Sequence, residues 1–220
     1  TMGSAKVGLQ TGDNQRFVRH FWEQTEYGNW KPFAKGGSDA WILPRIKRTV
    51  FWGEKGLEVR RFADSYPRNT DSYFNEALTY TVMKRSGRRF GYLHPNSVFG
   101  TMGSVFIPNR STWHILAYTN SHLFDYLMLT QTVERDWKRR IVAKIPWNEQ
   151  LDYDDTLANL SKRGVAKSIS KRQYEFVSPY YDQPVLLAVL AEESSGIEYD
   201  HPHRELRHDL DLDTPRETVA

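Results

Sequence analysis

The stretch that decides the fold reads LTYTVMKRSGRRFGYL and occupies residues 78–93. Its two ends are rich in β-branched and aromatic residues, whereas Ser86-Gly87 in the middle is a turn-forming pair. This pattern predicts a β-hairpin with strands over Leu78–Lys84 and Arg88–Leu93. Basic residues surround the turn, so the tip of the hairpin is suited to reach into a groove of a polyanion.

Short segments of the same kind flank the hairpin and are bounded by Gly, Pro, Asn and Ser. They predict further strands at Thr49–Trp52 and Val105–Ile107. Between these strands, Gly56–Ala63 and Thr70–Glu76 favour helices, the second behind a capping signal at Asn69/Thr70. About the first 110 residues are therefore expected to form a mixed or antiparallel sheet of short strands.

Helical periodicity begins at Ser111, where apolar residues recur every three or four positions. It predicts a pair of helices that is broken near Asn120-Ser121. A short strand at Ile141–Ile145 and helices over Leu151–Leu160 and Val165–Gln173 are expected to follow. Strands followed by packed helices define an α+β fold.

The composition fits a protein that folds without cross-links, since 39% of the residues are hydrophobic and 14% are aromatic. The chain has no cysteine, which excludes disulfides, thiolate zinc sites and cysteine nucleophiles. No apolar run approaches the roughly 18 residues of a membrane span, and no signal-peptide core follows Lys6. We therefore expect a cytoplasmic location and no membrane partner.

The net charge of +3 conceals an asymmetry along the chain. Residues 1–148 contain 22 lysines and arginines against 12 acidic residues, whereas residues 149–220 contain 8 against 15. The basic residues of the first part gather in four groups among aromatic residues, namely Arg45–Arg48, Arg60-Arg61, Lys84–Arg89 and Arg135–Arg140. Such a distribution favours a nucleic acid as the partner.

Familiar catalytic motifs are absent from the sequence. It contains no Walker loop, no paired-glycine dinucleotide fingerprint, no Gly-x-Ser-x-Gly elbow and no His-Glu-x-x-His. The turn Gly100–Ser104 is by itself a weak phosphate signal. We therefore assign no catalytic residue, no metal ligand and no cofactor to this chain.

One pattern leaves a metal-dependent nuclease open as an alternative. Carboxylates at Asp125, Glu134 and Asp136, with Lys138, resemble a magnesium site beside a general base. That chemistry requires Asp136 and Lys138 on one face of a strand, two residues apart. The arginines around them instead indicate a basic turn or a helix end. A scaffold subunit that binds proteins through its acidic tail is a further alternative.

The segment GLQTGDN at residues 8–14, followed by RFVR at residues 16–19, is a polar loop that leads into an arginine-bearing element. Turn formers such as those at residues 11–14 bind one another or an external phosphate through side chains and backbone N–H groups. This loop is therefore either a capped turn or a phosphate contact.

The same segment resembles the start of the target-recognition region in the large adenine methyltransferases of BREX phage defence, the PglX type. Further segments resemble motifs of that family and occur in the same order along the chain, at Trp30–Gly37, Phe74–Tyr80 and Arg88–Ile107. The segment His114–Ser121 is similar to a helix start shared with TaqI-like and type IIG specificity domains. Together the resemblances cover about residues 7–147.

The resemblance implies an α+β fold of the TaqI-like specificity-domain type and a module that recognises duplex DNA. It implies a target-recognition domain at 1–147, and the pattern and charge of the remaining residues predict a helical extension at 148–200 and an acidic, flexible tail at 201–220. The family's catalytic domain holds S-adenosylmethionine and a Pro-Pro-aromatic motif, but this sequence contains no Pro-Pro pair. We therefore expect a reader without its catalytic domain, acting in phage defence or restriction-modification, with that domain and other defence subunits as partners.

Twelve residues are assigned to DNA contact on this basis. Those expected to hold the backbone or to meet the catalytic domain are Thr11, Asn14, Arg16, Lys35, Gly36 and Gly37. Those expected to enter a groove are Arg85, Arg88, Arg89 and Ser104. Arg19 and Arg48 complete the set.

Overall fold

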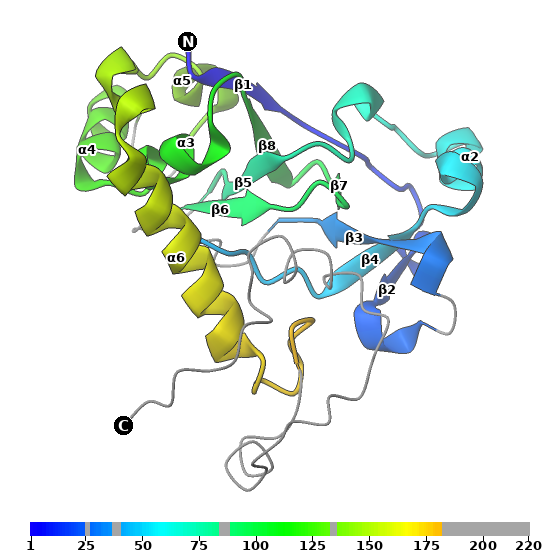
Figure 1. Ribbon diagram of the computed structural model, residues 1–220. Coiled ribbons are helices and arrows are strands. Elements are labelled where there is room, and N and C mark those ends of the chain that lie inside the picture. Colours follow the sequence, from blue (N-terminus) through cyan, green and yellow to red (C-terminus); the bar gives the residue numbers. More distant parts are fainter. Residues whose placement is uncertain (25–26, 37–40, 84–88, 133–135, 182–220) are drawn as a thin grey trace, which may run out of the picture.

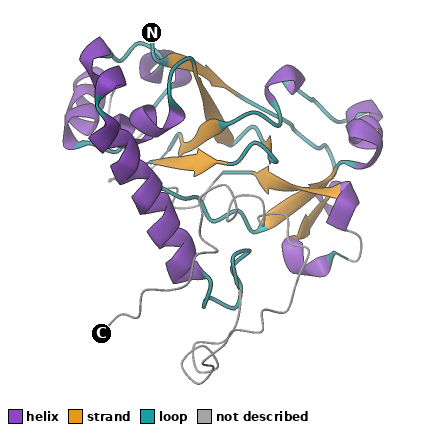
Figure 2. Cartoon of the chain, viewed as in Figure 1, coloured by secondary structure: helices purple, strands orange, loops and turns teal. Residues whose placement is uncertain are grey.

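The computed structural model describes residues 1–24, 27–36, 41–83, 89–132 and 136–181. Over these ranges, two sheets of short strands lie beside a group of helices (Figures 1 and 2), which confirms the predicted α+β class. No helix within these ranges is long and apolar enough to cross a membrane.

The first sheet is antiparallel and has the order β1-β8-β5-β6. Its strands are β1 (Gly3–Lys6), β5 (Ala77–Thr81), β6 (Phe90–Leu93) and β8 (Gly103–Pro108). Strands β5 and β6 form the predicted hairpin, in which Leu78 pairs with Tyr92 and Tyr80 with Phe90. The predicted turn, with Arg85 and Arg88, lies outside the described residues.

The second sheet has the order β2-β4-β3-β7 and is mixed, because β3 and β7 run parallel. Its strands are β2 (Val18–His20), β3 (Trp30–Ala34), β4 (Arg48–Phe51) and β7 (Val98–Phe99). The predicted strand at Thr49–Trp52 is therefore confirmed as β4, with an offset of one residue.

Alternating side chains bury both faces of the first sheet. On β5, Leu78 and Tyr80 face the core that the helices cover, whereas Ala77 points into a second core shared with the other sheet. On β8, Phe106 likewise packs in the core beneath the helices, whereas Val105 packs in the core shared with the other sheet. The first sheet thus lies between the helices and the second sheet (Figure 1).

The helices that cover the first sheet are α3 (Thr112–Thr119), α4 (His122–Gln131), α5 (Arg139–Val142) and α6 (Asp155–Arg172). The predicted break between α3 and α4 is confirmed, because the Ser121 hydroxyl accepts a hydrogen bond from the Phe124 N–H and caps α4. Helix α6 packs against α3 and buries Val165 and Ile169 in the core beneath the helices.

The helix predicted over Thr70–Glu76 is wrong. Only a single 3-10 turn forms, at Thr70–Ser72, and a turn in which Phe74 has a positive φ of 59° follows it before β5 begins. Asn69 does not cap this turn, because its side-chain amide donates to the distant carbonyl of Val7 at 2.8 Å. A tertiary hydrogen bond has replaced the local one that the sequence suggested.

Other predicted elements differ from the structure in their boundaries or in whether they are helices or strands. The apolar run Ile141–Ile145 is not a strand, since α5 covers its start and Val142 and Ile145 lie three residues apart in one core. The two helices predicted after residue 150 are one helix, α6, which begins after the cap residue Asp154. The helix predicted at Gly56–Ala63 is confirmed as α2 (Gly53–Arg61), whose first turn contains residues of positive φ.

Candidate nucleic-acid interface

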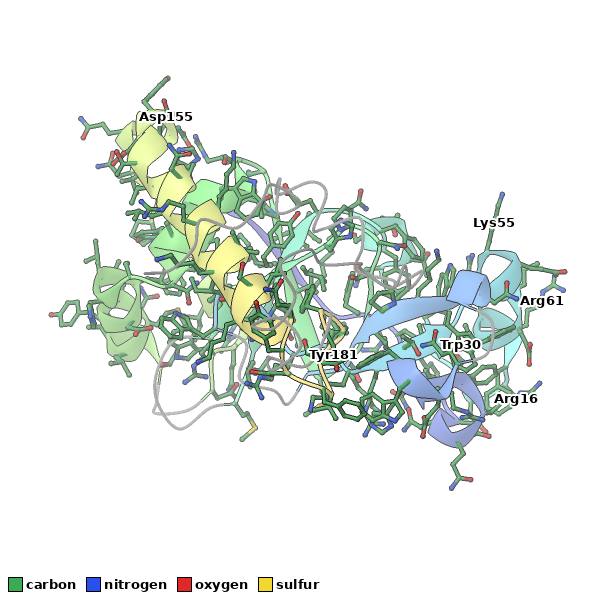
Figure 3. All side chains as sticks on the ribbon, turned by 60° about the horizontal axis from the view of Figure 1, so that its bottom comes forward. Arg16, Trp30, Lys55, Arg61, Asp155 and Tyr181 are labelled. Atoms are coloured by element: carbon green, nitrogen blue, oxygen red, sulfur yellow. The ribbon has the colours of Figure 1, made fainter. Side chains whose placement is uncertain are left out.

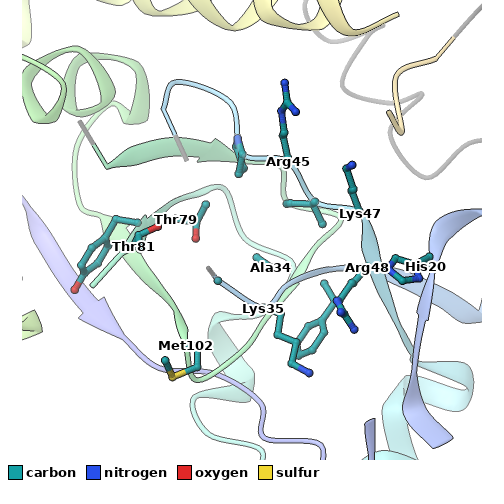
Figure 4. Close-up of a pocket in the computed structure, with 14 residues that line it drawn as sticks. His20, Ala34, Lys35, Arg45, Lys47, Arg48, Thr79, Thr81 and Met102 are labelled. Atoms are coloured by element: carbon teal, nitrogen blue, oxygen red, sulfur yellow. The ribbon is translucent and has the colours of Figure 1, made fainter. Parts of the chain in front are cut away.

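A cleft of about 600 Å³ opens between the second sheet and the end of β5 (Figure 4). The ends of β2, β3, β4 and β5, the segment before β4 and the turn before β8 all contribute to its walls. The lining residues are His20, Phe33, Ala34, Lys35, Gly36, Pro44, Arg45, Ile46, Lys47, Arg48, Thr79, Tyr80, Thr81 and Met102.

The cleft gathers four cationic side chains, of which Arg45 is paired with Glu175 from outside the lining. Lys35, Arg45, Lys47 and Arg48 contribute cations, and none of these lining residues is acidic. Burial lowers the pKa of the Lys35 ammonium, and the neighbouring Arg48 guanidinium lowers it further. A cleft lined by cations raises the local concentration of anions.

Strand pairing and α6 position these cations. Antiparallel pairing of β2 and β4 sets His20 opposite Arg48. The segment before β4 is tied to α6, because the Arg172 guanidinium donates to the carbonyls of Leu43 at 2.7 Å and Pro44 at 3.1 Å. Arg45 also forms an ion pair of 3.2 Å with Glu175, just beyond the helix. The end of α6 therefore holds one wall of the cleft.

Of the residues predicted from the sequence, Lys35, Gly36 and Arg48 line this cleft. His20, Arg45 and Lys47 also line it but were not predicted as site residues. The sequence signal for Arg45 and Lys47 was the basic group Arg45–Arg48. In the structure, Ile46 of this group is buried, Lys47 is half-buried and Arg48 is exposed. Gly37 lies outside the described residues.

Gly36 closes one side of the cleft through its backbone. Its φ is +84°, and a Cβ at this position would overlap the carbonyl of Met102. We expect Gly36→Ala to destabilise the protein by about 1–3 kcal/mol, since it combines a strained φ with a backbone clash. Denaturant unfolding measures this loss. Gly28→Ala is the matched control, because nothing lies within 4 Å of a Cβ there, and an equal loss in both variants would contradict the close approach.

The loop at residues 11–19 is a capped turn. The Thr11 hydroxyl and the Asn14 side-chain carbonyl are 2.9 Å apart, and Thr11 is buried. Asp13 caps the short helix α1 (Asn14–Phe17) by accepting a hydrogen bond from the Arg16 N–H at 3.0 Å. These internal bonds account for the turn formers that the sequence singled out.

Arg16 and Arg19 are engaged with their own surroundings. The Arg16 guanidinium forms an ion pair of 2.7 Å with Glu58 and lies over the rings of Phe17 and Phe62. The Arg19 guanidinium donates to the backbone carbonyl of Val18 at 2.9 Å. Figure 3 shows Arg16 and Trp30 at the same end of the molecule, opposite Asp155. Neither arginine lines the cleft.

Arg89 and Ser104 lie inside the protein, with 2% and 0% of their surfaces exposed. The Arg89 guanidinium donates to the carbonyl of Val82 at 2.8 Å. The guanidinium carbon Cζ lies 4.1 Å from the centre of the Trp137 ring. Ser104 pairs with Tyr80 between β8 and β5. Because neither side chain reaches the surface, we omit both from the DNA-contacting set that we propose below.

The nuclease constellation does not assemble on a strand. Lys138 is the N-cap residue of α5, and its ammonium lies 3.8 Å from the Asp136 carboxylate. Burial lowers the pKa of Arg89 to about 10, and the negative charges of Asp125 and Asp136 offset part of this lowering. Glu134 lies outside the described residues. Within the described part of the chain, no three His, Asp or Glu residues group as a metal site.

No family model matches this chain. The chain is 33% identical over 101 residues to the adenine-specific methyltransferase BrxX of Escherichia coli O9:H4 (strain HS). The matched segment covers 44% of this chain and 8% of that methyltransferase, so the chain corresponds to a small part of its length.

Proposed function

We propose that this chain is the duplex-DNA recognition module of an adenine-specific DNA methyltransferase that acts in phage defence. The similarity to BrxX supports the relation to a methyltransferase. The observation that carries DNA binding is the convergence of Lys35, Arg45, Lys47 and Arg48 on a cleft whose lining contains no carboxylate.

Phosphate groups supply the negative charge that this cleft lacks. Arginine suits such a role because its planar guanidinium donates two hydrogen bonds to one phosphate, whereas lysine acts as a point charge. Backbone contacts of this kind fix the position of a protein on a duplex without reading its sequence. In our proposal the cleft therefore holds the DNA backbone, and the predicted groove residues Arg85 and Arg88 contact the bases.

The cleft does not suit the methyl donor that the resemblance implies. S-adenosylmethionine carries a positive sulfonium, which the cations of the cleft repel. We therefore assign this chain no step of methyl transfer. In the proposed enzyme, a separate catalytic domain holds the donor, and the residues described here bind and orient the DNA. We propose that domain and other defence subunits as partners.

We keep the predicted domain boundary at residue 147 in this proposal, and we add that α6, which lies beyond it, supports the cleft. Helix α6 lies beyond that boundary, yet Arg172 at its end fixes the segment that carries Arg45. Recognition therefore requires the helical extension as well as the sheets.

Salt dependence tests the proposal. We expect duplex DNA to bind without magnesium and with an affinity that falls steeply with salt. A log–log slope of about −3.6 is expected if four cations each contact one phosphate. Fluorescence anisotropy with a labelled duplex of mixed sequence measures this slope. No binding at low micromolar protein and low salt, or an affinity that does not change with salt, would contradict the proposal.

A further inference from the structure

A large apolar side chain stands exposed among the cations of the cleft. Met102 lies in the turn between β7 and β8 and lines the cleft, with 68% of its surface exposed. Exposure of this kind does not stabilise the fold, because apolar side chains gain free energy by leaving water. In Figure 4, Lys35 and Met102 lie on one side of the cleft, while Arg45 and Lys47 extend on the other.

The backbone beneath Met102 is fixed from two directions. The N–H of Gly100 donates to the carbonyl of Ala34 at 2.9 Å, and the N–H of Gly8 donates to the carbonyl of Gly100 at 3.2 Å. On the other side of the turn, a Cβ at Gly103 would overlap the Ala34 carbonyl, as one at Gly36 would overlap that of Met102. The turn therefore presents Met102 from a backbone packed against the end of β3.

We infer that Met102 is a wedge that inserts between stacked base pairs of the duplex held in the cleft. This inference rests on the proposed function, because it needs DNA in the cleft. Proteins that distort DNA combine cations on the phosphates with an apolar side chain between base steps, and the duplex kinks by about 20–90°. Both parts of that arrangement are present here, because Lys35 and Met102 line the same cleft.

The side chain is suited to such a position. Methionine is unbranched and flexible, so it adapts to the irregular gap between two base pairs. Burial of its exposed surface between bases offsets part of the cost of unstacking them. The cations on both sides of the cleft hold the phosphates of the kinked duplex while the bases separate.

Fluorescence of 2-aminopurine tests the wedge, because this base emits more strongly when it is unstacked. The probe is a duplex of about two helical turns, roughly 21 base pairs, in which 2-aminopurine replaces several adenines. We expect the unaltered chain to bind it and to increase the emission. Met102→Ala should abolish the increase and bind about tenfold more weakly. Met102→Leu should restore both, because leucine also serves as a wedge.

The matched control is Leu129→Ala, which removes a side chain of 60% exposure from α4 outside the cleft and should change neither readout. If the unaltered chain binds the duplex but the emission does not rise, or Met102→Ala raises it equally, the wedge is wrong and the proposed function stands. If the unaltered chain binds no duplex at low salt, the proposed function fails and the wedge fails with it.

Discussion

Replacing Lys35 and Arg48 together by glutamate should weaken duplex binding by about a hundredfold or more. Each charge-assisted hydrogen bond to a phosphate contributes about 1.5–3 kcal/mol, and tenfold in affinity corresponds to about 1.4 kcal/mol. The two glutamates also repel the phosphates that the cleft attracts. Both side chains line the cleft, and Arg48 is exposed, so the fold should tolerate the changes.

Anisotropy at several salt concentrations measures the effect. The log–log slope should become shallower by about 1.8, since two phosphate contacts are lost. Lys55→Glu is the matched control, because Lys55 is exposed on α2 and does not line the cleft, and because the substitution changes the charge in the same sense. If Lys55→Glu weakened binding as much per charge as the cleft variant, net charge would explain the binding and the cleft would lose its role.

Arg89→Ala should destabilise the fold by about 3 kcal/mol, the largest effect on stability that we expect from a charged residue here. The change leaves the carbonyl of Val82 without this donor and removes the cation that lies over Trp137. It also removes the positive charge that attracts the carboxylates of Asp125 and Asp136. Denaturant unfolding measures the loss.

The fraction of Arg89→Ala that remains folded should bind duplex DNA as the unaltered chain does, because Arg89 is 2% exposed. Arg89→Met is a useful companion variant, because it keeps much of the volume over Trp137 and removes the charge and the donors. A large loss of DNA affinity together with an unchanged free energy of unfolding would show that Arg89 contacts DNA, as its sequence position suggested.

Local signals predicted the α+β class and the strands β4, β5, β6 and β8, but not β1, β2, β3 or β7, nor the division into two sheets. Alternation around residues 78–93 predicted the β5/β6 hairpin, and the polar pair Asn120-Ser121 predicted the break between α3 and α4. Errors arose where a distant partner decided the outcome. Asn69 bonds to Val7 instead of capping a helix, and no feature of residues 70–76 indicates that bond.

The candidate site was harder to predict than the fold. Arg89 belongs to a basic group in the sequence, yet it is buried because Trp137, almost fifty positions later, covers it. The cleft itself arises where β3, β4 and β5 meet, so neither Lys35 nor Arg45 reveals it alone. Charge in a sequence predicts a partner class, whereas the pairing of strands decides which charges face that partner.

The most direct test of DNA binding in the cleft is a comparison of lysine acetylation with and without saturating duplex DNA, read by mass spectrometry. We expect Lys35 and Lys47 to become protected, while Lys55 and Lys162, which are exposed outside the cleft lining, remain reactive. Unchanged reactivity of Lys35 and Lys47 in the presence of bound duplex would contradict the account.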